Sequence, residues 1–97
     1  MTAKNERRLL IVEDDAAFAR TLVRSFERRG YQVRHLAGEE GIAALLDEFA
    51  PTHAVVDLKL AGGASGLSSV RRLHDADPEM VIVVLTGYAS IATAVEA

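Results

Sequence analysis

The chain has 97 residues, of which 49% are hydrophobic and 26% charged, a balance typical of one soluble globular domain. Its formal net charge of −3 argues against a nucleic-acid or membrane surface, and the absence of cysteine excludes disulfides and zinc–thiolate sites. The longest wholly apolar run, residues 80–85, is too short to span a membrane, and the polar amino terminus does not resemble a signal peptide. The sequence therefore favours a cytoplasmic protein.

Four short apolar runs are predicted as strands, at residues 8–12, 31–37, 53–58 and 80–85. Three of these runs are continuous rather than alternating, which is typical of parallel strands that are covered on both faces. The run at residues 31–37 alternates apolar and polar side chains, so we expect it at an edge of the sheet.

Four helices are expected between and after these strands. The first begins at Asp15, which caps it, runs to about Arg29 and ends at a left-handed Gly30. Its predicted inward stripe has a helical spacing and consists of Phe18, Leu22, Val23 and Phe26. The second helix is expected at residues 39–49. The third follows Gly66 and should bury three aliphatic side chains, Leu67, Val70 and Leu73. The fourth should begin at Ser90 and carry Ile91, Ala92 and Val95.

This fourfold alternation of strand and helix predicts an α/β fold, a doubly wound parallel sheet of the flavodoxin-like type with strand order 2-1-3-4. The chain ends at Ala97, within the expected fourth helix. We therefore expect residues 1–97 to form one domain that is incomplete at its carboxyl end, with a fifth strand and helix missing. Because the outer edge of the fourth strand would then be uncovered, we also expect a homodimer or a swapped assembly.

Oxygen-bearing side chains follow three of the predicted strands. Glu13 and Asp14 follow the first strand, Asp57 lies near the end of the third, and Thr86 follows the fourth. The carboxyl ends of parallel strands meet at one edge of a sheet, so these residues should converge. Neighbouring carboxylates repel one another, and Mg²⁺, which prefers oxygen ligands, would offset that cost. The pattern thus predicts a Mg²⁺ site with one carboxylate available for phosphoryl transfer. For the run at residues 13–15 alone, helix capping is an equally good explanation.

Taken together, these motifs resemble the receiver domain of two-component response regulators. The resemblance covers the chain from about residue 8 to its end. It is carried by four segments, Leu10-Ile11-Val12-Glu13-Asp14-Asp15, Val55-Val56-Asp57-Leu58-Lys59-Leu60, Gly66-Leu67 and Val84-Leu85-Thr86-Gly87. Residues 87–95 further resemble redox-responsive regulators that carry a Fis-type helix-turn-helix.

The resemblance implies a role for each of these polar residues. Asp57 would accept a phosphoryl group from a phosphohistidine on a sensor histidine kinase. Asp14 and Asp57 would bind Mg²⁺, Glu13 would act through water, and the backbone carbonyl of Lys59 would be a further ligand. Thr86 would bond a phosphoryl oxygen. Such a module is not an enzyme with a separate substrate, because it promotes only its own phosphorylation and dephosphorylation. It would control an output domain, absent from this chain, through which alone the protein would contact DNA.

The sequence departs from the family pattern at three places. Ala61 stands where the family usually has proline, and the loop from Asp57 to Gly66 is about one residue longer than is common. The phosphate-contacting lysine of the family would lie beyond Ala97. We therefore expect the chain to hold the acidic pocket without completing the switch.

Two alternative functions remain open from the sequence. One is a Mg²⁺-dependent phosphatase of the haloacid-dehalogenase type, which also uses an aspartate nucleophile at a strand end. That chemistry needs an acid two residues after the nucleophile, where this chain has Lys59. The other is a receiver-like module used only for protein contacts, and the intact set of acidic residues argues against it.

Overall fold

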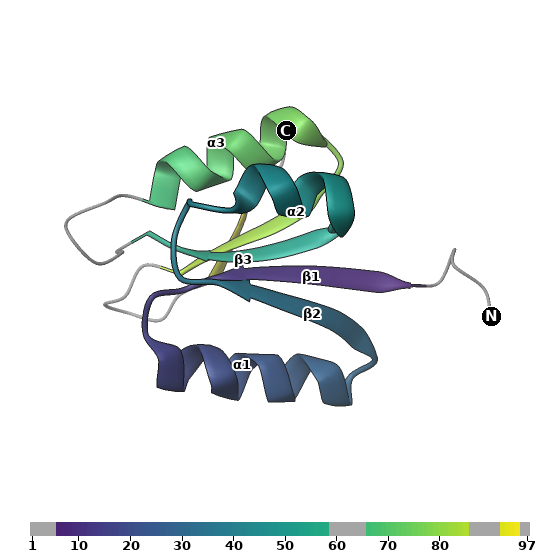
Figure 1. The fold of residues 1–97 in the computed structure, drawn as a ribbon, viewed down its shortest axis with the longest axis vertical. Coiled ribbons are helices and arrows are strands. Elements are labelled where there is room, and N and C mark those ends of the chain that lie inside the picture. Colours follow the sequence, from purple (N-terminus) through teal and green to yellow (C-terminus); the bar gives the residue numbers. More distant parts are fainter. Residues whose placement is uncertain (1–5, 59–65, 86–91, 96–97) are drawn as a thin grey trace.

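The fold is a central sheet with helices on both faces (Figure 1). The computed structural model describes residues 6–58 and 66–85, and the backbone of residues 92–95. The elements in chain order are β1 (Arg7–Val12), α1 (Ala16–Arg28), β2 (Tyr31–Leu36), α2 (Ile42–Glu48), β3 (His53–Asp57), α3 (Gly66–Ala76), β4 (Val81–Leu85) and β5 (Ala92–Val95). Within the described residues, no helix is long and apolar enough to cross a bilayer.

The strand order is β2-β1-β3-β4-β5, and the first four strands are parallel to one another. The predicted order 2-1-3-4 is therefore confirmed. The register pairs Val12 of β1 with Val56 of β3, and Asp57 of β3 with Leu85 of β4. The ends of β1, β3 and β4 consequently reach the same edge of the sheet.

Alternate side chains of the central strands build two apolar layers, which explains why their sequences are continuously apolar. One layer packs against α2 and α3, and its strand residues include Leu10, Val12, Val56 and Ile82. The other layer, centred on Leu9, Ile11 and Val55, packs against side chains of α1. Figure 1 shows α1 alone on its face of the sheet, with α2 and α3 on the other.

The ends of α1 are as predicted, but its buried stripe is narrower. The side chain of Asp15 accepts hydrogen bonds from the backbone N–H groups of Ala17 and Phe18, and Gly30 is left-handed with φ +92°. Phe18, however, is 43% exposed, so its predicted burial is wrong. In the first turns, Ala19 is the buried side chain, and its neighbour Phe18 points about 100° away from it around the helix.

Helix α2 is shorter than the predicted span of residues 39–49. Gly41, immediately before it, has φ +96°, a left-handed conformation that interrupts a right-handed helix. Glu39 therefore lies outside α2 and instead forms an ion pair with Arg72 of α3 at 3.0 Å.

In α3, Val70 and Leu73 are buried as predicted, whereas Leu67 is 57% exposed and its predicted inward position is wrong.

The predicted fourth helix is wrong where the structure describes it. Residues 92–95 form β5, which pairs antiparallel with β4, while Ser90 and Ile91 lie outside the described residues. An eight-residue helix is marginal, and the β-branched Thr93 and Val95 favour a strand at the open edge of β4. The expectation that this edge is uncovered is therefore also wrong. Self-association of the chain remains a prediction, but an uncovered edge of β4 no longer supports it.

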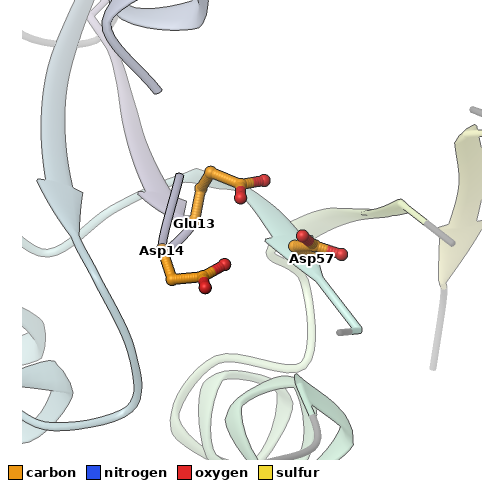
Figure 2. Close-up of side chains that lie close together, drawn as sticks. All are labelled: Glu13, Asp14 and Asp57. Carbon is orange, nitrogen blue, oxygen red and sulfur yellow. The ribbon is translucent and has the colours of Figure 1, made fainter. Parts of the chain in front are cut away.

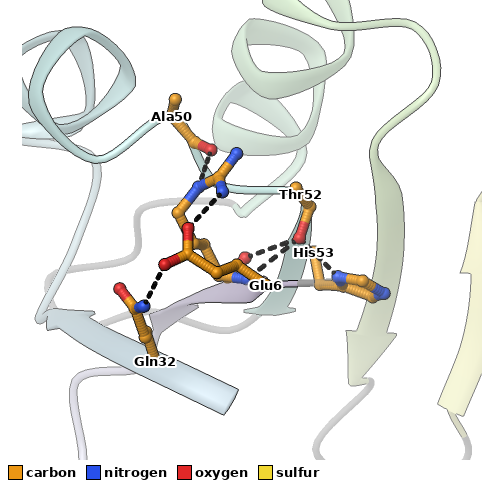
Figure 3. A network of polar contacts seen from close by, with 6 residues as sticks. Glu6, Gln32, Ala50, Thr52 and His53 are labelled. Carbon is orange, nitrogen blue, oxygen red and sulfur yellow. Dashed lines mark hydrogen bonds and ion pairs between the residues drawn. The ribbon is translucent and has the colours of Figure 1, made fainter. Parts of the chain in front are cut away.

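A polar network joins β1, β2 and the start of β3 at the edge opposite to the acidic residues (Figure 3). Arg8 donates from Nε to the carbonyl oxygen of Ala50 at 2.7 Å and pairs with Glu6 at 3.3 Å. The hydroxyl of Thr52 accepts the backbone N–H of Arg8 at 3.0 Å and lies 2.7 Å from Nδ1 of His53. These contacts fix the register at the amino ends of the strands.

Candidate metal centre

The strand register places the carboxylates that follow β1 next to the carboxylate that ends β3. Because Val12 pairs with Val56, the residues that follow each of them, Glu13 and Asp57, come next to one another at the ends of β1 and β3. The chain then turns through Asp14 into the cap of α1. Figure 2 shows Glu13, Asp14 and Asp57 together at this edge.

The three carboxyl groups are close enough to share one cation. One carboxylate oxygen from each of Glu13, Asp14 and Asp57 lies within 4.8 Å of the other two. Glu13 is buried, Asp57 is partly exposed and Asp14 is exposed, so the cluster opens to solvent on one side. An all-oxygen, anionic donor set with an open side suits a hard divalent cation such as Mg²⁺ or Ca²⁺. The predicted convergence of these three residues is therefore present in the structure.

Glu13 is the constrained member of the cluster. The residue is only 3% exposed, its Oε2 accepts the backbone N–H of Asp15 at 3.0 Å, and its own N–H donates to the carbonyl oxygen of Leu36 at 2.9 Å. On the other side, His35 donates from Nε2 to the Glu13 carbonyl oxygen at 2.7 Å. The Glu13 side chain thus has little freedom to move away from Asp57.

Burial raises the pKa of Glu13 from 4.5 to about 7. The hydrogen bond from the backbone N–H of Asp15 opposes this rise, while the charge of Asp57, a hydrogen bond shared with it and the charge of Asp14 add to it. A divalent cation would favour the ionised form of Glu13. The raised pKa therefore reflects chiefly the cost of burying a charged Glu13, to which the charges of Asp57 and Asp14 add, and a cation would offset that cost.

Gly66 is a site residue whose role the sequence did not predict. A Cβ atom at this position would overlap the carbonyl oxygen of Asp57 and lie 2.9 Å from Cα of Leu58. The Gly66 N–H also donates to the carbonyl oxygen of Leu58 at 3.0 Å. The start of α3 therefore rests directly on the backbone of Asp57, and only glycine fits there. The sole sequence signal was its place in the Gly66-Leu67 motif.

Two predicted site residues, Thr86 and Lys59, lie outside the described residues. The structure shows only that Leu85, the residue before Thr86, pairs with Asp57.

Of the three histidines, His35 contacts the backbone of Glu13, whereas His53 is at the opposite edge and burial lowers its pKa. Within the described residues, the acidic cluster is the only group of three or more such side chains that is arranged to hold a metal ion.

Comparison with known sequences gives a single family. The pattern described as the response regulator receiver domain matches residues 9–97. The photosynthetic apparatus regulatory protein RegA of Rhodobacter capsulatus is 45% identical over 93 residues, and the acid tolerance regulatory protein ActR of Rhizobium meliloti is 44% identical over 93 residues. These alignments cover 96% and 95% of this chain but 50% and 47% of the relatives. The chain thus spans about half the length of the curated relatives it matches.

Solved structures agree with the sequence comparison. A response regulator from Burkholderia pseudomallei, determined with a phosphorylated aspartic acid, calcium ion and citrate, has a TM-score of 0.77 and 42% sequence identity. The similarity covers 89% of this chain and 50% of that one. A CheY-like receiver domain from Methanospirillum hungatei has a TM-score of 0.76 and 34% identity, over 90% of this chain and 69% of that one.

Because the pKa of Glu13 is raised in the folded chain, the free energy of unfolding should decrease as the pH rises. Between pH 4.5 and about 7, the unfolded chain loses the Glu13 proton while the folded chain retains it, so rising pH favours unfolding. Without metal, we expect Glu13→Gln to increase the free energy of unfolding at pH 8 by about 1–3 kcal/mol, with little change at pH 4. Urea unfolding at both pH values measures this. Asp15→Asn, which keeps the capping oxygen, is the control, and an equal gain in both variants would contradict the account.

Gly66→Ala should disturb the site through the backbone of Asp57. We expect the free energy of unfolding to fall by about 1–3 kcal/mol because the new methyl group overlaps main-chain atoms. Divalent-cation affinity, measured by calorimetric titration, should fall by about tenfold because Asp57 is displaced. Gly38→Ala is the matched control, since a Cβ atom there has no neighbour within 4 Å. If Gly66→Ala binds the cation as tightly as Gly38→Ala does, Gly66 does not position Asp57.

Proposed function

The chain belongs to the response regulator receiver domain family, and from that premise we propose that Asp57 is its phosphoacceptor. The observation that carries the proposal is the cluster itself, in which a partly exposed Asp57 lies against a buried Glu13 and an exposed Asp14. A phosphorylated aspartate and a calcium ion occur in the crystal structure of the Burkholderia relative, which is 42% identical to this chain. The family is a signalling module, and its reaction is directed at its own aspartate.

The transfer itself needs one nucleophilic oxygen and charge neutralisation. A carboxylate oxygen of Asp57 forms a bond to the phosphorus of a phosphohistidine, while the bond from that phosphorus to the imidazole nitrogen of the donor breaks. The donor histidine leaves and takes up a proton, and Asp57 carries an acyl phosphate. Water later attacks the phosphorus, which returns the carboxylate and releases inorganic phosphate. Partial exposure of Asp57 suits this reaction, because a donor must approach the carboxylate in line.

Three side chains of this cluster would hold Mg²⁺, which supplies positive charge against the carboxylates and the phosphoryl oxygens. Asp14 and Asp57 are the proposed direct ligands, and the buried Glu13 acts through water. The backbone carbonyl of Lys59 and the hydroxyl of Thr86 complete the proposed set, as metal ligand and phosphoryl contact. Their roles rest on the family pattern, because both residues lie outside the described part of the chain.

The proposed partners follow from the family and from the length of the relatives. The phosphoryl donor is a sensor histidine kinase, and phosphorylation controls an output domain, which regulates transcription. The curated relatives include regulatory proteins that are about twice as long as the matched region. A phosphatase of the haloacid-dehalogenase type is the weaker candidate, because Lys59 stands where that chemistry needs an acid.

Phosphorylation of Asp57 can be tested without the kinase. After incubation with acetyl phosphate and Mg²⁺, intact-protein mass spectrometry should show the mass gain of one phosphoryl group, and the gain should disappear with a chelator. Asp57→Asn should abolish the gain because the amide is not a nucleophile for this reaction. Asp15→Asn should retain it, since the side chain of Asp15 is engaged in capping α1. Equal labelling of Asp57→Asn and the wild-type chain would contradict the proposal.

A further inference from the structure

The backbone of Glu13 lies just beyond the regular pairing of β1 with β2. The register ends with Val12 opposite Leu36, and one further bond follows, from the N–H of Glu13 to the carbonyl oxygen of Leu36 at 2.9 Å. A parallel ladder would continue with a bond from the N–H of Gly38 to the carbonyl oxygen of Glu13. The strand β2 ends at Leu36, however, and within the described residues no backbone N–H donates to this oxygen.

The side chain of His35 supplies a donor in place of the missing ladder bond. Its Nε2 lies 2.7 Å from the carbonyl oxygen of Glu13. A carbonyl oxygen can only accept, so Nε2 carries the hydrogen whether or not Nδ1 carries one as well. Glu13 is buried, and a buried carbonyl group without a partner is unfavourable. The imidazole therefore satisfies a main-chain group that the end of β2 leaves open.

This contact fixes the peptide group that leads to Asp14. The carbonyl group of Glu13, the N–H of Asp14 and the two flanking Cα atoms lie in one plane, because the peptide bond does not rotate freely. A hydrogen bond to the oxygen of that plane therefore restricts the position of the Asp14 Cα atom. One residue later, Asp15 is held as the cap of α1. Asp14 itself is exposed, so its place in the acidic cluster depends on the backbone on either side of it.

Packing does not explain a histidine at this position. His35 is exposed, whereas Val33, two residues earlier on the same side of β2, packs against the apolar layer next to α1. Threonine or valine at an exposed strand position would favour the strand at least as well. Neither of these side chains has a nitrogen donor that reaches the Glu13 carbonyl group. The observed contact thus points to a role at the acidic cluster rather than in the core.

We propose that His35 is a positioning residue for the metal centre and acts through the main chain of Glu13 and Asp14. Its hydrogen bond holds the carboxylate of Asp14 near those of Glu13 and Asp57 before a cation arrives. The inference rests on the proposed function, in which Asp14 and Asp57 bind Mg²⁺. Loss of a group that orients metal ligands commonly weakens metal binding by about 10- to 100-fold.

Four substitutions separate positioning from a general structural role. Glutamine carries its amide nitrogen four bonds from Cα, as histidine carries Nε2, whereas asparagine carries it three bonds away. We therefore expect His35→Ala and His35→Asn to weaken Mg²⁺ binding by about tenfold, and His35→Gln to stay within about threefold of the wild-type chain. His74→Ala, which removes an imidazole from α3, should bind Mg²⁺ as the wild-type chain does. Calorimetric titration measures each affinity.

A second measurement needs no metal. Hydrogen exchange followed by NMR reports local opening at the N–H groups of Glu13 and Asp15, which donate to Leu36 and to the Glu13 carboxylate. His35→Ala should accelerate exchange at both groups by at least about fivefold, because the segment between β1 and α1 loses an anchor. Exchange at Leu10, in the buried middle of β1, should not change.

Three results would overturn the proposal. Unchanged Mg²⁺ affinity in His35→Ala would show that the contact does not position the ligands, and an equal loss in His35→Gln would show that the donor is not what matters. Equal acceleration of exchange at Leu10 would show that the substitution only destabilises the whole fold. A wild-type chain that neither binds Mg²⁺ nor is labelled by acetyl phosphate would contradict the proposed function instead. The metal-free exchange rates at Glu13 and Asp15 would then still show whether His35 holds this segment.

Discussion

The structure depends on one constraint, which is that a buried carboxyl group, Glu13, is held beside two other carboxyl groups at the ends of β1 and β3. The pairing of Val12 with Val56 brings Glu13 next to Asp57, and Asp14 lies within reach of both. Burial is the largest cost of ionising Glu13, and the charges of Asp57 and Asp14 add to that cost. The folded protein therefore keeps a proton on Glu13 to about neutral pH or, as we propose, takes up a divalent cation in its place.

The surrounding structure keeps this unfavourable arrangement from relaxing. The backbone of Glu13 is held to β2 through Leu36 and His35, and its carboxylate accepts the N–H of Asp15. On the other strand, Gly66 lets the start of α3 rest on the backbone of Asp57. Two apolar layers and the polar network around Arg8 fix the strands themselves. The site is thus preorganised, with a charge cost that ligand binding can recover.

Much of this arrangement is predictable from the sequence, for identifiable physical reasons. Continuous apolar strands alternating with helices define a parallel sheet, and the strand ends then place Glu13, Asp14 and Asp57 at one edge. Periodicity places side chains around a helix but does not fix which of them face the sheet at each turn, so the predicted burial of Phe18 and Leu67 is wrong. Residues 92–95 were assigned to a helix because local pattern does not reveal an open strand edge. The pKa of Glu13 and the fit of Gly66 depend on distances that no sequence pattern contains.

The most direct test of this account is the ionisation of Glu13 itself. A carbon-detected NMR titration of its side-chain carboxyl group, with and without Mg²⁺, measures the pKa in both states. We expect a pKa of about 7 in the metal-free chain and a large decrease when Mg²⁺ is present, because the cation favours the carboxylate. A pKa near the ordinary value of 4.5 that does not respond to Mg²⁺ would show that burial and neighbouring charge do not disfavour the ionised Glu13 and that the carboxylates do not share a cation.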